Sequence, residues 1–183
     1  MIICGIDWSL SCPAITVFNG ESFSVDACKF YFYNDKKKFM GHPRFIGTQY
    51  DEWENFQERY LNLATWALSV ILPYADHVYI EDYALGVNKG AVFNIAECTQ
   101  TLKLMLYKLK IPLTPIPPTV IKKFYTGKGT AKKQDMEKVF IEETGLDIKK
   151  ALVMTEKQEN PSSDIIDSFA ICKLGYQMFT TAK

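Results

Sequence analysis

The chain has 183 residues, 21 Lys and Arg against 21 Asp and Glu, and 48% hydrophobic residues. This length suits one domain, and the composition supplies a sizeable core and excludes a globally disordered chain. The balanced charge excludes a uniformly basic nucleic-acid-binding surface, although not a local basic patch. No run approaches the roughly 20 apolar residues of a membrane span, and the first residues lack the basic segment of a secretory signal. Five cysteines without Cys-x-x-Cys spacing indicate reduced thiols in a cytoplasmic protein.

The first third of the chain predicts three antiparallel strands. Residues 2–7 form an apolar run that ends in an acid, and residues 14–19 and 23–33 are rich in β-branched and aromatic side chains. Asn19-Gly20, between the last two runs, predicts a tight hairpin turn. Residues 34–50, with their lysines and glycines, are interpreted as a loop or insertion.

The rest of the chain predicts helices that alternate with two further strands. Hydrophobic periodicity and the positions of Gly and Pro give the following elements in chain order: a helix over about 51–72, a strand over 77–83, a loop over 86–90, a helix over about 91–109, a strand over 112–117, and helices over about 119–125, 131–144 and 163–179. Three antiparallel strands followed by βαβ crossovers predict an α/β fold. We expect a mixed five-stranded sheet flanked by helices, in one domain over residues 1–183.

Acidic residues stand where predicted strands end and where the last predicted helix begins. Asp7 ends the first strand, Glu81 lies near the end of the fourth with Asp82 beside it, and Asp164 and Asp167 share one face of the last helix. Because neighbours in a strand point to opposite faces, only one of Glu81 and Asp82 should face a common site. Mg²⁺ prefers oxygen ligands, and two such ions about 3.5–4 Å apart can hold both reacting oxygens of a phosphodiester. The helix dipole alone could explain the last two acids, so the metal hypothesis depends on the combination.

A second charged feature is the segment 120–134, which contains no acid. It carries five lysines, Lys122, Lys123, Lys128, Lys132 and Lys133. Gly127 and Gly129 would let backbone amides approach a phosphate closely. The segment therefore predicts contacts to a nucleic-acid backbone, with a solvated loop and helix face as the alternative.

Four segments resemble one family in the same order along the chain. Residues 5–9 (Gly-Ile-Asp-Trp-Ser) resemble the first-strand motif of the RNase H-like superfamily. The next two, 80–97 and 121–133, resemble the middle and basic segments of RuvC-type Holliday junction resolvases, above all the phage-encoded members. Residues 163–170 are similar to the family's C-terminal Asp-x-x-Asp-[AS]-x-Ala helix. The chain departs from the family at Trp8-Ser9, where the usual motif has Pro-Gly, and at the apparent insertion 34–50.

This resemblance implies an RNase H-like endonuclease that resolves Holliday junctions and related branched DNA. Water activated by two Mg²⁺ ions, with Mn²⁺ able to substitute, would attack the phosphorus in line and leave a 5′-phosphate and a 3′-hydroxyl. The resemblance makes Asp7, Glu81, Asp164 and Asp167 the metal-binding catalytic tetrad, with Lys133 as a further catalytic residue. The implied DNA-binding residues are Tyr83, Lys89, Lys122, Lys123, Lys128, Lys132 and Lys133.

The resemblance also implies a quaternary structure and a location. The protein would be a homodimer through the 91–109 helix, DNA-associated in a bacterial or phage-infected cytoplasm and without membrane contact. Tyr83 would stack at the junction centre, with Phe93 as the alternative, although a core tyrosine is an equal interpretation. Other functions stay open: a nuclease for flaps, forks or RNA–DNA hybrids, a junction-binding protein without cleavage, and an actin-like nucleotide-binding protein. Cys4 and Cys12 are expected to pack in the core.

Overall fold

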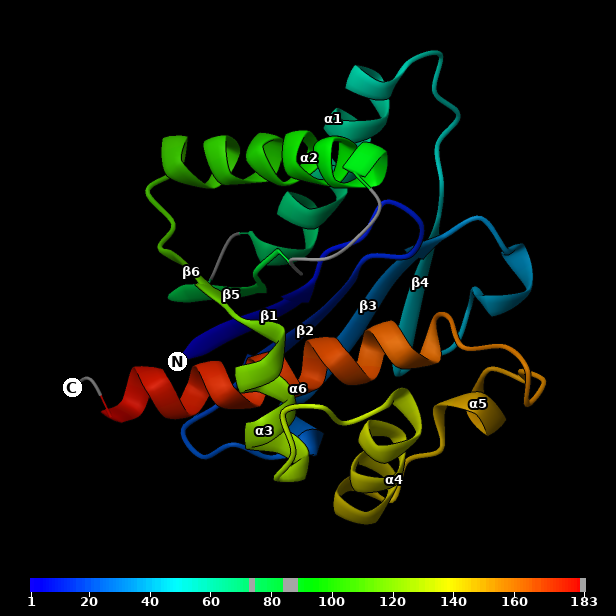
Figure 1. The fold of residues 1–183 in the computed structure, drawn as a ribbon, viewed down its shortest axis with the longest axis vertical. Coiled ribbons are helices and arrows are strands. Elements are labelled where there is room, and N and C mark those ends of the chain that lie inside the picture. Colours follow the sequence, from blue (N-terminus) through cyan, green and yellow to red (C-terminus); the bar gives the residue numbers. More distant parts are fainter. Residues whose placement is uncertain (73–74, 84–88, 182–183) are drawn as a thin grey trace.

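Six strands form one mixed sheet at the centre of the protein. The computed structural model describes residues 1–72, 75–83 and 89–181, with side chains described from residue 92 in the last range. The strand order is β4-β3-β2-β1-β5-β6 (Figure 1). The strands are β1 (Ile2–Asp7), β2 (Ala14–Asn19), β3 (Cys28–Asn34), β4 (Phe45–Gln49), β5 (His77–Glu81) and β6 (Leu113–Ile116). The pairs β1–β2 and β2–β3 are antiparallel, whereas β1–β5, β5–β6 and β3–β4 are parallel.

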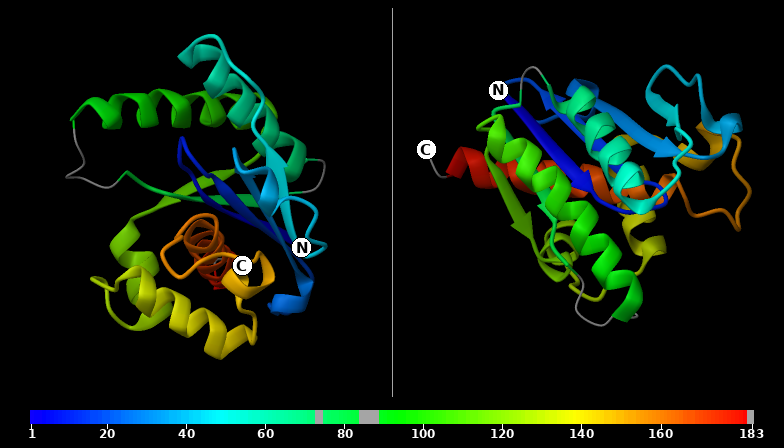
Figure 2. Two further views of the ribbon diagram at one scale, coloured as in Figure 1. Left: turned by 90° about the vertical axis from the view of Figure 1, so that its right-hand side faces the viewer. Right: turned by 90° about the horizontal axis from the view of Figure 1, so that it is seen from above.

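Helices cover both faces of this sheet (Figures 1 and 2). One face carries α1 (Phe56–Ile71) and α2 (Lys89–Lys108). The opposite face carries α3 (Pro118–Thr126), α4 (Lys133–Thr144), α5 (Ile148–Ala151) and α6 (Ser162–Thr181). Two short 3₁₀ helices lie in the N-terminal half, at Val25–Ala27 and Lys37–Phe39. The predicted α/β fold with antiparallel strands followed by parallel crossovers is confirmed, with six strands in place of five.

The alternation of side chains along each strand divides the interior into two cores. On β1, Ile3 joins the core beneath α6, whereas Cys4 and Ile6 join the core beneath α1 and α2. Phe169 of α6 lies against Phe30 of β3 with ring centroids 6.0 Å apart. All five cysteines are free and buried. Within the described ranges, no helix is both long and apolar enough to cross a bilayer.

The predicted hairpin is confirmed, but its connection is longer than a tight turn at Asn19-Gly20. Strands β2 and β3 do pair as an antiparallel hairpin, but Phe18 lies opposite Cys28, so the connection runs over residues 20–27. Phe23 of that connection packs on Phe18, with ring centroids 5.0 Å apart, and also contacts Phe169 and Tyr176. The burial of this aromatic ring favours the longer connection over a two-residue turn.

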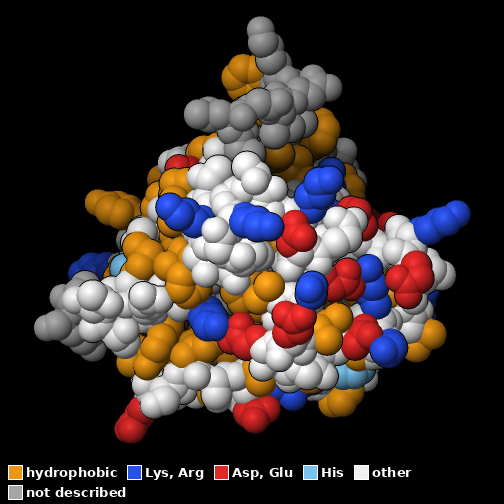
Figure 3. All heavy atoms as spheres, turned by 60° about the horizontal axis from the view of Figure 1, so that its bottom comes forward, with side chains coloured by type: hydrophobic (Ala, Val, Ile, Leu, Met, Phe, Trp, Pro, Cys, Tyr) orange, Lys and Arg blue, Asp and Glu red, His pale blue; other side chains and the backbone are white. Residues whose placement is uncertain are grey.

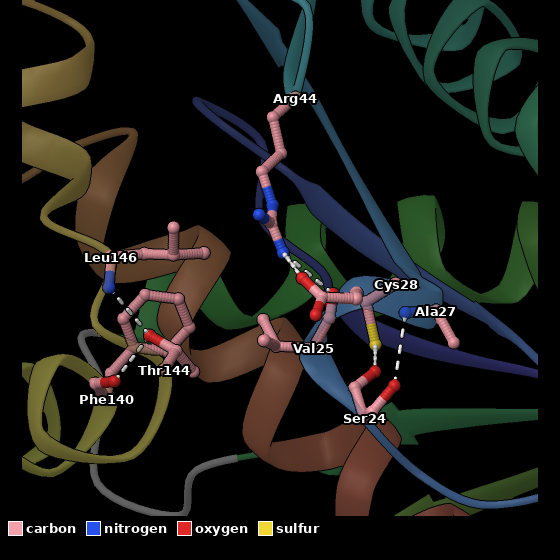
Figure 4. A network of polar contacts seen from close by, with 9 residues as sticks. Ser24, Val25, Ala27, Cys28, Arg44, Phe140, Thr144 and Leu146 are labelled. Carbon is pink, nitrogen blue, oxygen red and sulfur yellow. Dashed lines mark hydrogen bonds and ion pairs between the residues drawn. The ribbon is translucent and has the colours of Figure 1, made fainter.

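The interpretation of residues 34–50 as a loop is wrong for Phe45–Gln49, which form β4. Phe45 is buried against Phe30, with ring centroids 5.4 Å apart. Arg44 donates to the Val25 carbonyl oxygen at 3.0 Å and pairs with Asp26 at 3.2 Å, which ties the start of β4 to the β2–β3 connection (Figure 4). An aromatic anchor and a fixed arginine therefore order a strand whose glycines and flanking lysines resemble a loop.

The other predicted elements are confirmed with small shifts at their ends. Helix α1 begins at Phe56 because Asn55 caps it, accepting from the Glu58 amide at 2.9 Å. Helix α5 (Ile148–Ala151) was not predicted from the sequence. Most of the predicted loop 86–90 lies outside the described residues.

Candidate active site

The carboxyl ends of two adjacent parallel strands place Asp7 and Glu81 side by side. Ile6 of β1 lies opposite Ile80 of β5, so the acids that follow them are neighbours across the sheet. Ile3 and Tyr79, an even number of residues earlier in each strand, face the core beneath α6. By alternation the two acids face α6 as well. Asp82 then points the other way, and its carboxylate accepts from the Tyr83 amide at 2.9 Å.

Helix α6 brings Asp164 and Asp167 to the same place because it packs closely on β1. The sulfur of Cys172 donates to the Ile3 carbonyl oxygen at 3.4 Å, and the Ser168 hydroxyl lies 2.8 Å from that of Thr16 on β2. The helix therefore runs from the carboxyl end of β1 back towards its start. Asp164 lies one turn before Ser168 on the same stripe of the helix. Its carboxylate is thereby directed towards the end of the strand that carries Asp7.

Burial disfavours the ionised forms of all four carboxyls, and their charges act on one another. Asp7 and Asp164 are buried, with 8% and 7% exposure. Burial, followed by the charges of Asp164, Asp167 and Glu81, raises the pKa of Asp7 well above its usual value. Burial is also the main cause that raises the pKa of Glu81 and Asp164 to about 7 and that of Asp167 to about 6. Four carboxylates held this way repel one another when all are ionised.

Two lysines of the predicted basic segment face this carboxylate cluster (Asp7, Glu81, Asp164 and Asp167). Lys122 of α3 lowers the pKa of Glu81 and Asp167, and Lys133 lowers the pKa of Asp7, Asp164 and Asp167. Gly127 ends α3 in the left-handed conformation, with φ 80°, and the chain then turns into α4, whose first residue is Lys133. The glycine turn therefore lets one short segment present cations from two helices.

The remaining predicted DNA-binding residues lie further out. Lys123, Lys128 and Lys132 are solvent-exposed on the α3–α4 side of the molecule. Over this side, basic side chains are interleaved with acidic ones (Figure 3). The side chain of Lys89 lies outside the described residues.

Tyr83 is an exposed residue beside the cluster, which excludes the interpretation as a core tyrosine. Its side chain is 37% exposed, and the Lys103 ammonium lies 5.1 Å from the ring centroid. The ring lines a cavity of about 130 Å³ together with Glu81 and Trp8. Phe93, the alternative stacking residue, is 69% exposed on α2.

Sequence reasoning missed three residues around the cluster. Cys12, expected only to pack, is buried with its thiol beside Asp164, where it lowers the pKa of that carboxyl. Glu159 pairs with Lys133 at 2.9 Å, and the Ser163 hydroxyl lies 3.5 Å from the same ammonium. No motif or spacing in the sequence marks Cys12 or Glu159, because tertiary packing alone brings them here.

The donor atoms of the cluster fit a hard divalent cation. All four side chains offer carboxylate oxygens, and the buried Oδ2 of Asp164 has no hydrogen-bond partner. A buried acceptor without a partner costs free energy unless something else satisfies it. In the described part of the chain, however, no three Asp, Glu, His or Cys side chains are already gathered to hold an ion. Metal binding would therefore require these carboxylates to draw closer together.

The raised pKa values predict an unusual dependence of stability on pH. The pKa of an Asp or Glu side chain is about 4 in an unfolded chain. In the folded protein the pKa is about 6 for Asp167 and about 7 for Asp164 and Glu81. A carboxyl with a raised folded pKa stabilises the fold fully below the unfolded pKa, and this stabilisation is lost as pH rises through the folded pKa. We expect the free energy of unfolding in EDTA, measured by urea denaturation, to fall from pH 5 to pH 8. Millimolar Mg²⁺ should restore it at pH 8, and a metal-free stability that rises over this interval would contradict the account.

Solved structures share this fold, whereas no protein-family model and no curated protein sequence matches the chain. RuvC of Thermus thermophilus is 18% identical with a TM-score of 0.64, over 99% of this chain and 98% of that one. The same protein in complex with Holliday junction substrate is 15% identical with a TM-score of 0.66, over 99% and 97%. The fowlpox virus resolvase, in complex with substrate Holliday junction DNA, is 18% identical with a TM-score of 0.50, over 100% of both chains. The chain thus has the RuvC fold from end to end, and the RNase H-like architecture expected from its sequence is confirmed.

Proposed function

We propose that this protein is a metal-dependent endonuclease, a single nuclease domain that resolves four-way DNA junctions and related branched DNA by paired phosphodiester hydrolysis. The observation that carries the proposal is the convergence of Asp7, Glu81, Asp164 and Asp167 from β1, β5 and α6 on one edge of the sheet. Lys122 of α3 and Lys133 of α4 act on them electrostatically. The fold supports the choice of substrate, because the similar Thermus thermophilus RuvC has been solved with a Holliday junction.

The carboxylate cluster would hold the catalytic metal. Two divalent cations bound there, Mg²⁺ or Mn²⁺, would activate a water molecule and neutralise charge on the scissile phosphate. The protein's own contribution is to carry the oxygen ligands on rigid elements, from which the side chains would close on the metal. The Cys12 thiol beside Asp164 would favour the ionised form of this ligand, because it lowers the pKa of the carboxyl.

Lysines and an aromatic ring would bind the DNA. Lys122 and Lys133 lie next to the carboxylates, so they would contact the phosphates around the scissile bond and stabilise charge in the transition state. The exposed Lys123, Lys128 and Lys132 would extend this contact, and each lysine that neutralises a duplex phosphate adds about 0.9 to the salt dependence of binding. Tyr83, exposed beside Glu81, offers a face on which an unpaired base would stack. Lys89 and Phe93 would contribute from the start of α2.

The outer face of α2 would form the homodimer interface. Leu102 and Leu106 pack into the protein, whereas Leu104 and Tyr107 are 51% and 81% exposed. These two line a groove of about 450 Å³ together with Ile111 and Leu113 at the β6 edge. A two-fold axis through this face would present two sites to the two symmetric cuts of a junction. The protein would act where such DNA occurs, in a bacterial or phage-infected cytoplasm.

Tyr107→Glu should convert the dimer to a monomer. The side chain is almost fully exposed in one protomer, so a charge there costs the monomer little but would be buried and unpaired in the dimer. Light scattering after size exclusion should give half the wild-type mass with an unchanged melting temperature. Val153→Glu is the matched control, because Val153 is 84% exposed on the opposite side of the sheet. A wild-type protein that is monomeric at high concentration would contradict this interface.

The function is tested by cleavage of synthetic four-way junctions with Mg²⁺ or Mn²⁺. We expect paired nicks at symmetric positions, no cleavage in EDTA, and little cleavage of linear duplex. Flaps, forks and RNA–DNA hybrids of the same sequence serve as competitors. If the protein cleaves one of these substrates in preference to the junction, that substrate would take the place of the four-way junction in the proposal. If it binds junctions but cleaves nothing in the presence of metal, the proposed nuclease activity would be wrong and the protein would be a junction-binding architectural protein.

A further inference from the structure

Lys133 stands between two sets of carboxylates. On its outer side, its ammonium pairs with Glu159 at 2.9 Å. Its charge also lowers the pKa of Asp7, Asp164 and Asp167, and Asp167 lines the same cavity as Lys133. The Lys133 ammonium can therefore interact either with Glu159 or with the carboxylates of the cluster.

Glu159 is held firmly at the entrance to α6. Its carbonyl oxygen accepts from the Ser163 amide at 2.9 Å, and the Ser163 hydroxyl donates to the Asn160 side chain at 3.0 Å. The Ser163 hydroxyl also lies 3.5 Å from the Lys133 ammonium, so two groups from the start of α6 hold the lysine from the same side. Both contacts engage the ammonium with groups other than the four carboxylates of the cluster.

An open cavity borders both the Lys133–Glu159 ion pair and Asp167 of the cluster. It measures about 140 Å³ between α4 and the start of α6, and its lining includes Lys133, Glu159, Ser163 and Asp167. The Lys133 and Glu159 side chains are 51% and 56% exposed. An exposed ion pair of this kind is weak, so the lysine can exchange one partner for another.

We propose that Glu159 is a positioning residue that holds the Lys133 ammonium outside the carboxylate cluster and so keeps the cluster available to a divalent cation. Without Glu159, the mutually repelling carboxylates would attract the lysine inward, and its charge would compete with the metal for the same oxygens. The same contact leaves Lys133 at the mouth of the site, where a DNA phosphate can replace Glu159. This inference rests on the proposed metal-dependent function.

The test measures Mn²⁺ binding to the DNA-free protein by calorimetry. The proteins compared are wild type, Glu159→Gln, Lys133→Met and the double variant. Glu159→Gln should weaken Mn²⁺ binding by about three- to fivefold, in line with the small strength of an exposed ion pair. Lys133→Met should strengthen Mn²⁺ binding. In the double variant, which lacks Lys133, adding Glu159→Gln should change Mn²⁺ binding by less than about twofold relative to Lys133→Met alone. Melting temperatures should be the same for all four proteins, because both side chains are half exposed.

Glu156→Gln is the matched control. Glu156 is exposed and lines the same cavity, but the ammonium of Lys133 pairs with Glu159. It therefore reports the general effect of losing one negative charge, which should be less than about twofold. Equal weakening by Glu156→Gln and Glu159→Gln, or equal weakening by Glu159→Gln with and without Lys133, would overturn the positioning role. A wild-type protein that binds no Mn²⁺ would overturn the metal site itself, whereas additive effects in a protein that cleaves junctions would overturn only the role of Glu159.

Discussion

Asp7→Asn should reduce cleavage of a four-way junction by at least about 10³-fold at saturating Mg²⁺, because bound metals supply several kcal/mol of transition-state stabilisation. Asp7 is the most central member of the cluster, since the charges of all three other acids act on its carboxyl. An amide in its place keeps the shape of the side chain but is a poor ligand for a hard cation. Single-turnover cleavage with excess enzyme measures the loss without interference from product release.

The same variant should be more stable than the wild type when metal is absent. The substitution removes a buried carboxyl whose ionised form is disfavoured by burial and by the charges of Asp164, Asp167 and Glu81. We expect a higher melting temperature in EDTA at pH 8 and an affinity for the junction that is unchanged or slightly increased. This combination of inactivity with a more stable, DNA-binding fold separates a lost ligand from a misfolded protein.

Asp82→Asn is the matched control, because the same substitution falls next to Glu81 on the opposite face of the chain. Its carboxylate accepts from the Tyr83 amide at 2.9 Å, and an asparagine oxygen can accept the same hydrogen bond. Cleavage should stay within about threefold of wild type, since the charge lost there is not a ligand. A loss in Asp82→Asn comparable to that in Asp7→Asn would show that the alternation argument assigns the wrong acid.

The elements that carry the carboxylate cluster could be predicted from local patterns. An apolar run identified the strand that ends in Asp7, and the strand predicted over 77–83 contained Glu81 near its end. The three-residue spacing placed Asp164 and Asp167 on one face of a helix. What these patterns could not give was the register of β1 against β5, or the side of the sheet on which α6 packs. Those depend on contacts such as Thr16 with Ser168, which are 152 residues apart in the chain.

The errors have the same physical origin. Strand β4 was missed because the burial of Phe45 depends on Phe30, a residue of another strand. The connection of the β2–β3 hairpin is longer than an Asn-Gly turn because Phe23 packs on Phe169 and Tyr176 of α6. Glu159 gave no signal because its role depends on a lysine 26 residues earlier. Propensities describe neighbours in sequence, and these outcomes were decided by neighbours in space.

Gly5→Ala should be the most damaging small substitution in the core, because α6 touches the backbone of β1 at this residue. A methyl group on Gly5 would overlap the backbone nitrogen of Cys172 and the carbonyl oxygen of Ser168, and would stand 2.6 Å from the Cys172 Cα. Backbone atoms cannot rotate aside as a side chain can, so α6 must move away from the sheet. Overpacking of a core costs about 1–3 kcal/mol and occasionally more, and we expect the upper end or beyond. Urea denaturation measures the change.

The effect of Gly5→Ala should extend to the site, since Ser168 lies one residue after Asp167 and one turn after Asp164. If α6 shifts, both carboxylates shift with it, and displacements of about 1 Å at a catalytic site can cost about 10²-fold in rate. Gly20→Ala is the control: a methyl group there meets side chains and no backbone, Phe18 at 3.2 Å and Ala27 at 3.5 Å, and should cost less than about 1 kcal/mol with cleavage unchanged. A Gly5→Ala protein as stable and active as wild type would mean that α6 does not pack on β1 this closely. The placement of Asp164 and Asp167 beside Asp7 would then lose its structural basis.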